Sequence, residues 1–311
     1  MKRTAKAFAP AAISSFFEIC DTQDGKPITD LEKVGAIGGG FGLQRGVLTK
    51  VTTQGAEKNS IDVLINSKQT QEAKTTIRVI ETLLAKTNTK YNVTVEHKIE
   101  VPIGSGFGTS AGGALTAGLA LRETLELPLT YNQIGKIAHV AEIQCQTGLG
   151  TVSSLAFSGG CVLVVEPGAP GICQIDRIPI KPDHVIVAGY LESTIPKESI
   201  LASPQKKKEI NGYGKKTLKA ILDEPTLENF LDCCWEFSQK AGFATEKVCE
   251  LVKSAKKAGA IGATQNMIGE AVHAVVHEEN ANSVAEAFKQ ALNSQQVLVS
   301  EIDFQGARLI Q

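Results

Sequence analysis

The segment VPIGSGFGTSAGGALTAGLAL, residues 101–121, combines a glycine-rich bend with the start of a helix of small residues. Three alternate glycines, from Gly104 to Gly108, let the backbone bend sharply and come close to a ligand. Thr109 and Ser110 favour a helix N-cap, so we predict that the helix begins there. Because unpaired N–H groups and the helix dipole attract phosphate, the segment predicts a phosphate-binding loop.

The spacing of these glycines separates the loop from two common nucleotide-binding patterns. It is not a G-x-G-x-x-G sequence followed by an acid about twenty residues later, and no lysine follows as it does in G-x-x-x-x-G-K-[ST]. Ordinary dinucleotide-binding and Walker loops are therefore excluded. From the glycines alone, a structural turn without a ligand remains an alternative.

The composition bounds the class of protein. A length of 311 residues favours two domains, and 42% hydrophobic residues are ample for a buried core. Thirty-two basic residues against 33 acidic ones, without a long basic tract, predict no nucleic-acid partner. No apolar run approaches the roughly 18 residues of a membrane span, so no membrane partner is expected. Seven cysteines without a C-x-x-C pair indicate free thiols in a reducing cytoplasm.

Hydrophobic periodicity predicts an α+β fold. Strands are predicted at residues 46–53, 60–66, 91–101, 184–190, 270–277 and 295–303, and helices at 69–86, 131–146, 227–234, 248–255 and 284–292. The second half reads as a helix-covered antiparallel sheet. The glycine cluster VGAIGGGFGLQRG, residues 34–46, disfavours helix and strand and predicts a mobile or closely approached loop.

The predicted helix over residues 131–146 carries chemistry on one flank. His139, Glu142 and Gln146 share that flank at i, i+3 and i+7, beside an apolar stripe. A surface acid paired with lysine is the alternative interpretation of Glu142, and a helix-flank histidine without a role is that of His139.

The segment PIGSGFGTSAGGA, residues 102–114, resembles the central motif P-x-x-x-G-L-G-S-S-A-A of the GHMP kinases, with Phe107 for the usual Leu. The resemblance covers most of the chain and is strongest to the archaeal pantoate kinase branch. It is carried by AFAPAAISSFFEI, AHVAEIQCQTGLGTVSSLAFSGG, INGYGKKTL, FSQKAGFAT and ATQNMIGEAVHAVV.

This resemblance implies an ATP-binding domain over residues 1–168, like the second domain of ribosomal protein S5, and a ferredoxin-like domain over residues 169–311. It also implies that Ser110 and Glu142 hold Mg²⁺. The substrate would contact His139 and the early glycine cluster at Gly38, Gly39 and Gly40. The ATP phosphates would be bound by Pro102, Gly104, Ser105, Gly106, Phe107, Gly108, Thr109, Ser110 and Ala111. The implied reaction is ATP-dependent phosphorylation of the primary hydroxyl of pantoate, for coenzyme A biosynthesis in the cytoplasm.

The chain departs from its relatives on the acceptor side. Thr151 stands at the catalytic position where an Asp is expected, and Ala36 stands where a serine is usual. The strand at residues 159–165 lacks the expected substrate arginine, for which Arg45, Lys2 and Lys197 are candidate replacements. A GHMP kinase for another hydroxy acid or polyol, and a nucleotide-binding regulatory protein with weak or no catalysis, therefore remain alternatives. A homodimer is compatible with a helix-covered domain of this kind.

Overall fold

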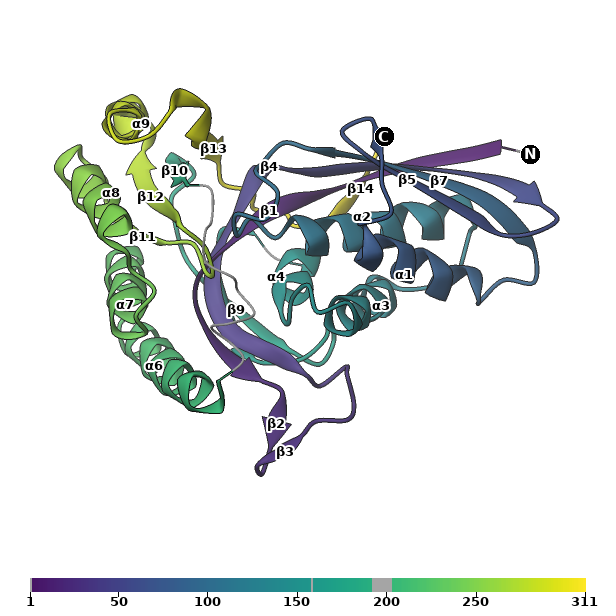
Figure 1. Ribbon diagram of the computed structural model, residues 1–311, viewed down its shortest axis with the longest axis horizontal. Coiled ribbons are helices and arrows are strands. Elements are labelled where there is room, and N and C mark those ends of the chain that lie inside the picture. Colours follow the sequence, from purple (N-terminus) through teal and green to yellow (C-terminus); the bar gives the residue numbers. More distant parts are fainter. Residues whose placement is uncertain (1, 158, 192–202) are drawn as a thin grey trace.

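The computed structural model describes residues 2–157, 159–191 and 203–311, and its described strands form two main sheets (Figure 1). The larger sheet is mixed, because β5 runs parallel to β7 while the other strand pairs are antiparallel. Its strands are β1 (Lys2–Cys20), β4 (Gly35–Ala56), β5 (Ser60–Ile65), β6 (Lys68–Gln69), β7 (Lys90–Ile99), β8 (Cys161–Glu166), β9 (Gln174–Ile178) and β14 (Arg308–Ile310). A small hairpin of β2 (Thr22–Gln23) and β3 (Lys26–Pro27) follows β1.

Strands β1 and β4 are unusually long and connect the two parts of the molecule. They pair from Lys2↔Gln54 to Cys20↔Gly35, with register shifts at Pro10/Ala11 and Ser14/Phe16. Such irregularities bend a strand and increase its twist. One portion of the pair lies with the other strands of the large sheet, and the far portion curves toward α6 and α7 (Figure 1).

The prediction of a loop over residues 34–46 is wrong, because strand β4 begins at Gly35 and continues through the cluster. The glycines serve the pairing with β1 instead. A Cβ on Gly40 would lie 1.7 Å from the carbonyl oxygen of Ile13, and one on Gly38 would lie 2.6 Å from that of Phe16. The close backbone approach expected of this segment is therefore confirmed, although it occurs within a strand.

Helices cover one face of the larger sheet. They are α1 (Lys74–Leu84), α2 (Thr109–Thr124), α3 (Tyr131–Gln144) and α4 (Thr151–Phe157). The small residues of α2 let it pack closely on the sheet, since a Cβ on Gly112 would lie 3.1 Å from Val47 Cγ2. The predicted helices over residues 69–86 and 131–146 are confirmed as α1 and α3, which begin or end within a few residues of the expected limits.

The smaller sheet is antiparallel and is packed by helices, as predicted. Its strand order is β11 (Gly262–Gln265), β12 (Ala271–His277), β10 (His184–Tyr190) and β13 (Val297–Glu301). The associated helices are α6 (Pro204–Asp223), α7 (Leu227–Lys240), α8 (Glu246–Lys257) and α9 (Ala281–Lys289). None of the helices in the described residues is long and apolar enough to cross a membrane.

The apolar interior is continuous across the junction of the two sheets. Phe41 of β4 packs edge to face against Phe230 of α7, with ring centroids 5.6 Å apart. Phe16 contacts the rings of Phe230 and Phe237 in the same manner. Aromatic pairs of this geometry stabilise beyond the area they bury. They hold the far portion of β1 and β4 rigidly against α7.

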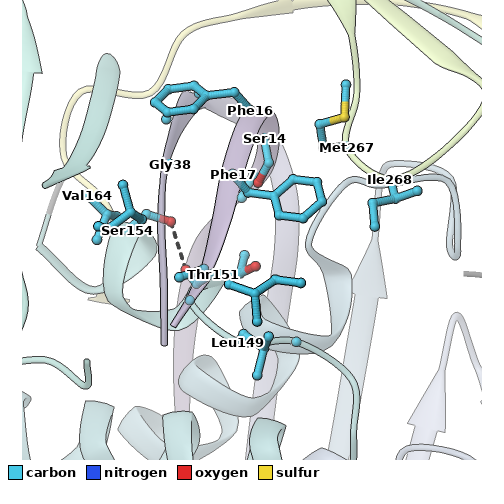
Figure 2. A pocket seen from close by; sticks show the side chains of 18 of the residues that line it. Ser14, Phe16, Phe17, Gly38, Leu149, Thr151, Ser154, Val164, Met267 and Ile268 are labelled. Atoms are coloured by element: carbon cyan, nitrogen blue, oxygen red, sulfur yellow. Dashed lines mark hydrogen bonds between the residues drawn. The ribbon is translucent and has the colours of Figure 1, made fainter. Parts of the chain in front are cut away.

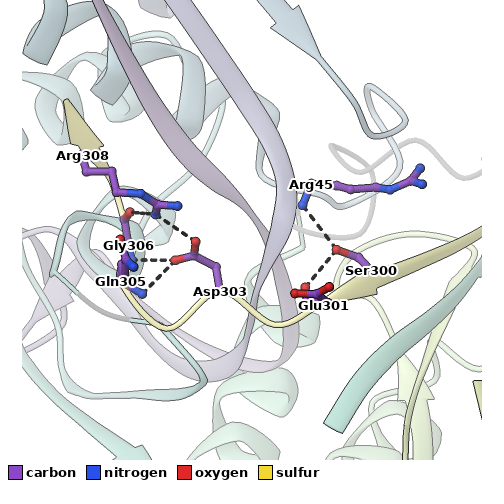
Figure 3. A network of polar contacts seen from close by, with 7 residues as sticks. All are labelled: Arg45, Ser300, Glu301, Asp303, Gln305, Gly306 and Arg308. Atoms are coloured by element: carbon purple, nitrogen blue, oxygen red, sulfur yellow. Dashed lines mark hydrogen bonds and ion pairs between the residues drawn. The ribbon is translucent and has the colours of Figure 1, made fainter. Parts of the chain in front are cut away.

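The C-terminal residues return to the larger sheet, where β14 pairs with β1. Figure 3 shows the polar contacts of Asp303 just before this strand. Asp303 fixes the turn before β14, because its buried carboxylate accepts hydrogen bonds from the N–H groups of Gln305 and Gly306. The same carboxylate forms an ion pair with Arg308 at 2.8 Å. The predicted second domain, residues 169–311, would include strands β9 and β14, and both of these strands belong to the larger sheet. The division of the chain between residues 168 and 169 remains a prediction.

Candidate active site

The predicted phosphate-binding loop, residues 100–108 and called the phosphate loop below, leads from β7 to α2 through three glycines in the left-handed region. Gly104, Gly106 and Gly108 have φ angles of 86°, 81° and 62°. Side chains rarely adopt these angles, so the bend requires glycine. Helix α2 begins at Thr109, but its N-cap is Gly108 and no side chain caps it. The predicted cap at Thr109 and Ser110 is therefore wrong, since the left-handed Gly108 already turns the chain into the helix.

Contacts with both parts of the molecule fix the position of this loop. The carbonyl of Phe107 accepts the N–H of Ala12 at 3.1 Å, and its buried ring packs edge to face on Tyr190. A Cβ on Gly106 would lie 3.5 Å from Asn266 Cβ and 3.6 Å from the Met267 carbonyl oxygen. Because the Phe107 side chain belongs to the core, only its backbone is available for the predicted ATP contact.

Ser110 lies in the first turn of α2, at one end of a chain of hydroxyl groups. Its Oγ donates to Thr75 Oγ1 at 3.1 Å, and Thr75 Oγ1 lies 2.9 Å from Thr147 Oγ1. These three residues and Thr109 line a small pocket of about 190 Å³. Sequence reasoning missed Thr75 and Thr147. Thr147 is the first residue of the TGLG stretch, residues 147–150, within the quoted segment AHVAEIQCQTGLGTVSSLAFSGG, whereas Thr75 lies in an ordinary amphipathic helix and carries no distinguishing signal.

Glu142 is a buried carboxyl group that lacks a full set of partners. Its side chain is 2% exposed, it accepts the N–H of Val152, and its Oε2 has no hydrogen-bond partner among the described residues. Burial raises the pKa of Glu142 to about 7. Gly148 leaves room for this group, because a Cβ there would lie 2.6 Å from Glu142 Oε1.

Ser110 and Glu142 fit a magnesium ion by their chemistry. The hydroxyl chain from Ser110 ends at Thr147, whose N–H donates to the backbone carbonyl of Glu142 at 3.0 Å. One hydroxyl and one carboxylate, together with phosphate oxygens and water, are the hard oxygen ligands that Mg²⁺ prefers. A buried carboxylate oxygen without a partner also suits a cation ligand. The assignment of these two residues to the metal remains a prediction.

His139 lies in the interior. It is 0% exposed, and its Nε2 lies 2.8 Å from the carbonyl oxygen of Val34. His139 lines neither the small pocket beside Ser110 nor the larger pocket described next. Because a carbonyl only accepts, Nε2 carries the proton. Burial lowers the pKa of His139, which disfavours its cationic form. His139 holds the chain at the start of β4, and its predicted contact with substrate remains a prediction.

A larger pocket of about 790 Å³ opens beside the phosphate loop (Figure 2). Gly38, Gly39 and Gly40 of β4 line one part of it, and Thr151 at the start of α4 lines another. A Cβ on Gly108 would lie 2.9 Å from Thr151 Cγ2, so this pocket adjoins the phosphate loop at Thr151. Of the residues predicted to act on the acceptor substrate, Gly38, Gly39, Gly40 and Thr151 thus lie around one pocket, and His139 does not.

The wall of this large pocket is mainly apolar. Phe16 and Phe17 of β1 line it, as do Met267 and Ile268 from the loop between β11 and β12 (Figure 2). Sequence reasoning missed these four residues because β1 and that loop are far apart in the chain. Their apolar side chains gave no signal that separated them from the core.

The described lining of the large pocket contains a single ionisable side chain, that of Asp21, which forms an ion pair with Lys207. Arg45 and Lys2, two candidate replacements for the family arginine, are exposed and do not line the pocket. Arg45 lies beside Ser300, whose Oγ accepts its backbone N–H at 3.3 Å (Figure 3). The third candidate, Lys197, lies outside the described residues.

Comparison with known proteins places this geometry in a family. Residues 74–159 match the model for the GHMP kinases N terminal domain. The pantoate kinase of Methanocaldococcus jannaschii is 29% identical over 289 residues, which are 92% of this chain and 97% of the relative. The pantoate kinase of Thermococcus kodakarensis is 30% identical over 282 residues, 89% of each chain.

A solved structure of a phosphotransferase related to the CoA biosynthesis pathway is 27% identical, with a TM-score of 0.85 over 99% of each chain. The fold and the phosphate loop therefore define a GHMP kinase. Within that superfamily, the chain belongs to the pantoate kinase family.

Proposed function

We propose that this chain transfers the γ-phosphate of ATP to the primary hydroxyl of pantoate, which gives 4-phosphopantoate for coenzyme A biosynthesis. The observation that carries the proposal is the contact of the phosphate loop with the large pocket at Gly108 and Thr151. A donor held on the loop and an alcohol held in the pocket then face each other. Family membership supplies the identity of the alcohol.

The phosphate loop would hold the donor. Its left-handed glycines leave the backbone bare, and the start of α2 favours negative charge. Ser110 and Glu142 would hold Mg²⁺, which neutralises charge on the phosphate oxygens when it is bound. The buried contacts of Phe107 keep the loop from moving away from the pocket. Positioning of this kind supplies much of the acceleration in phosphoryl transfer.

The acceptor side would work without a carboxylate base. Thr151 offers a hydroxyl that can accept or donate a hydrogen bond to the acceptor alcohol, but it cannot take up a proton as Asp would. A loose phosphoryl-transfer transition state places little demand on a base, because the alcohol can lose its proton late, to an oxygen of the phosphoryl group that it receives. Apolar contacts from Phe17, Met267 and Ile268 suit the two methyl groups of pantoate.

A second candidate is phosphorylation of another small hydroxy acid or polyol. It is favoured by one observation, the absence of a cationic side chain from the described lining of the large pocket. A substrate carboxylate ordinarily pairs with arginine or lysine. A polyol needs no such partner. A nucleotide-binding regulatory protein with little catalysis is the remaining alternative.

A coupled assay of ADP release separates these functions. The purified chain with Mg-ATP is expected to turn over with pantoate and to show at least about tenfold lower kcat/KM with mevalonate, homoserine or galactose. A preference for one of the other alcohols would favour the second candidate. Binding of ATP without turnover on any acceptor would contradict both kinase functions.

We also propose that the protein works in the cytoplasm, which its seven free cysteines support. The homodimer expected from the sequence remains a prediction.

A further inference from the structure

Two histidines face each other at one end of the smaller sheet. His184 begins β10 and His277 ends β12, and the two are directly opposite in the antiparallel register. Side chains in such a pair lie on the same face of the sheet. Their ring centroids are 5.0 Å apart with an interplanar angle of 69°.

Asp183 adds a carboxylate to this pair. Its Oδ2 lies 3.2 Å from His277 Nδ1, and its backbone carbonyl accepts the N–H of Glu278 at 3.0 Å. This backbone hydrogen bond from Glu278 joins the ends of β10 and β12 and fixes the backbone of Asp183 beside the two rings. One ligand atom from each of Asp183, His184 and His277 lies within 4.8 Å of the others.

His184 has an unsatisfied ring nitrogen. The residue is 6% exposed, and its Nδ1 has no hydrogen-bond partner among the described residues. Buried polar atoms are nearly always paired in folded proteins, and an exception calls for a partner.

We propose that Asp183, His184 and His277 bind one divalent transition-metal ion. Two imidazole nitrogens and one carboxylate oxygen suit Zn²⁺, Ni²⁺ or Co²⁺, whereas Mg²⁺ prefers oxygen alone. Three protein ligands leave coordination positions for water. His277 and Asp183 are partly open to solvent, which gives the ion a path of entry.

This transition-metal site is remote from the proposed phosphate loop. Tyr190, at the opposite end of β10, contacts Phe107 of that loop. Tyr190 is six residue steps of extended strand from His184, a distance of roughly 20 Å. The metal would therefore cross-link two strand ends and stabilise the sheet without touching the reacting groups.

Calorimetric titration of the full chain with Ni²⁺, under reducing conditions, tests the proposal. Nickel is the chosen probe because the seven free thiols compete strongly for zinc. The wild type is expected to bind one equivalent of Ni²⁺, and His184→Gln and His277→Gln should each lower the affinity by more than about tenfold. Loss of a residue that only hydrogen-bonds to a metal ligand already lowers metal affinity about 10–100-fold, and these histidines are proposed as ligands themselves. The exposed acid Asp62, on β5 of the larger sheet, supplies the control variant Asp62→Asn, which should bind as the wild type does.

Two further readouts separate metal binding from damage to the fold. Ni²⁺ should raise the Tm of the wild type and of Asp62→Asn but not that of either histidine variant. His277 is partly exposed, so His277→Gln should keep the metal-free Tm and the rate with Mg-ATP. Equal nickel affinity in the wild type and His277→Gln, or no nickel binding by the wild type, would overturn the proposal.

Discussion

Gly40 of β4 lies so close to Ile13 of β1 that a Cβ on Gly40 would be 1.7 Å from the Ile13 carbonyl oxygen. That oxygen belongs to the backbone and cannot rotate away. Gly40→Ala should therefore force the two strands apart and lower the free energy of unfolding by at least about 2 kcal/mol. It should also distort the large pocket, which Gly40 lines. Urea denaturation measures the first effect.

Gly55 provides the matched control on the same strand, because a Cβ there meets no atom within 4 Å and its φ is not positive. Gly55→Ala should change the free energy of unfolding by less than about 1 kcal/mol. Equal stability of the two variants would show that β1 and β4 are not packed as closely as described.

Ser110→Ala should lower kcat/KM about 100-fold, because the hydroxyl is proposed to contact the metal on the transferred phosphate. The fold should survive, since the lost hydrogen bond to Thr75 is worth only about 1 kcal/mol. The Mg²⁺ concentration for half-maximal rate should rise in the variant. Steady-state kinetics at several Mg²⁺ concentrations make the measurement.

Thr75→Val is the companion variant, since it removes the hydroxyl beside Ser110 but leaves Ser110 itself. Its loss of rate should be smaller than that of Ser110→Ala. A fully active Ser110→Ala protein with unchanged Mg²⁺ dependence would contradict the proposed metal site.

Glu142→Gln should reduce activity and yet stabilise the metal-free protein at high pH. The pKa of Glu142 is about 7 when folded and about 4.5 when unfolded, so the folded state holds the proton over this range. The unfolding free energy of the wild type therefore falls as pH rises from 4.5 to 7, by about 3 kcal/mol. The glutamine variant loses this dependence.

The comparison of Glu142→Gln with wild type at pH 5 and pH 8 is internally controlled, because any packing defect of the amide acts equally at both values. The unfolding free energy of the variant, relative to that of the wild type, should be higher at pH 8 than at pH 5. A constant difference between the proteins would mean that Glu142 is not the buried, unpaired acid described here.

His97→Gln should reduce the sensitivity of the protein to acid. His97 is buried between Thr49 and Thr76, and burial lowers its pKa to about 4 from 6.5. The unfolded state takes up a proton first as pH falls, so this residue costs about 2 kcal/mol of stability by pH 5. Glutamine can bond both threonines without titrating. Its unfolding free energy should fall less steeply between pH 6.5 and 4, and parallel curves would refute the assignment.

Much of the fold follows from local patterns in the chain. The strand at residues 184–190 is recognised to the residue because its apolar run follows the turn residues Pro182 and Asp183, and the phosphate loop is recognised from its glycines. In β4, the strand predicted at residues 46–53 is confirmed, but the preceding part from Gly35 was missed. The glycines there are needed for close pairing with β1, and local propensity does not include such a partner. The N-cap was misplaced for a related reason, since Gly108 satisfies the turn without a side-chain cap.

The candidate site could be predicted where its residues share one short segment. It could not be predicted where residues that are distant in the sequence come into contact. Ser110 and the three glycines lie in one short segment, the loop and the first turn of α2, whereas Thr75 reaches Ser110 only because α1 packs on α2. Met267 reaches the large pocket through its N–H bond to the Ser14 carbonyl at 2.7 Å. No sequence pattern contains either contact.

The position of the phosphate in the reaction product tests the central claim most directly. The purified chain, incubated with Mg-ATP and pantoate, should give a product whose phosphorus couples in ³¹P–¹H spectra to the two protons of the primary carbon. That result identifies 4-phosphopantoate. Coupling to the single proton of the secondary carbon, or no phosphorylated pantoate while another alcohol is consumed, would contradict the proposed function.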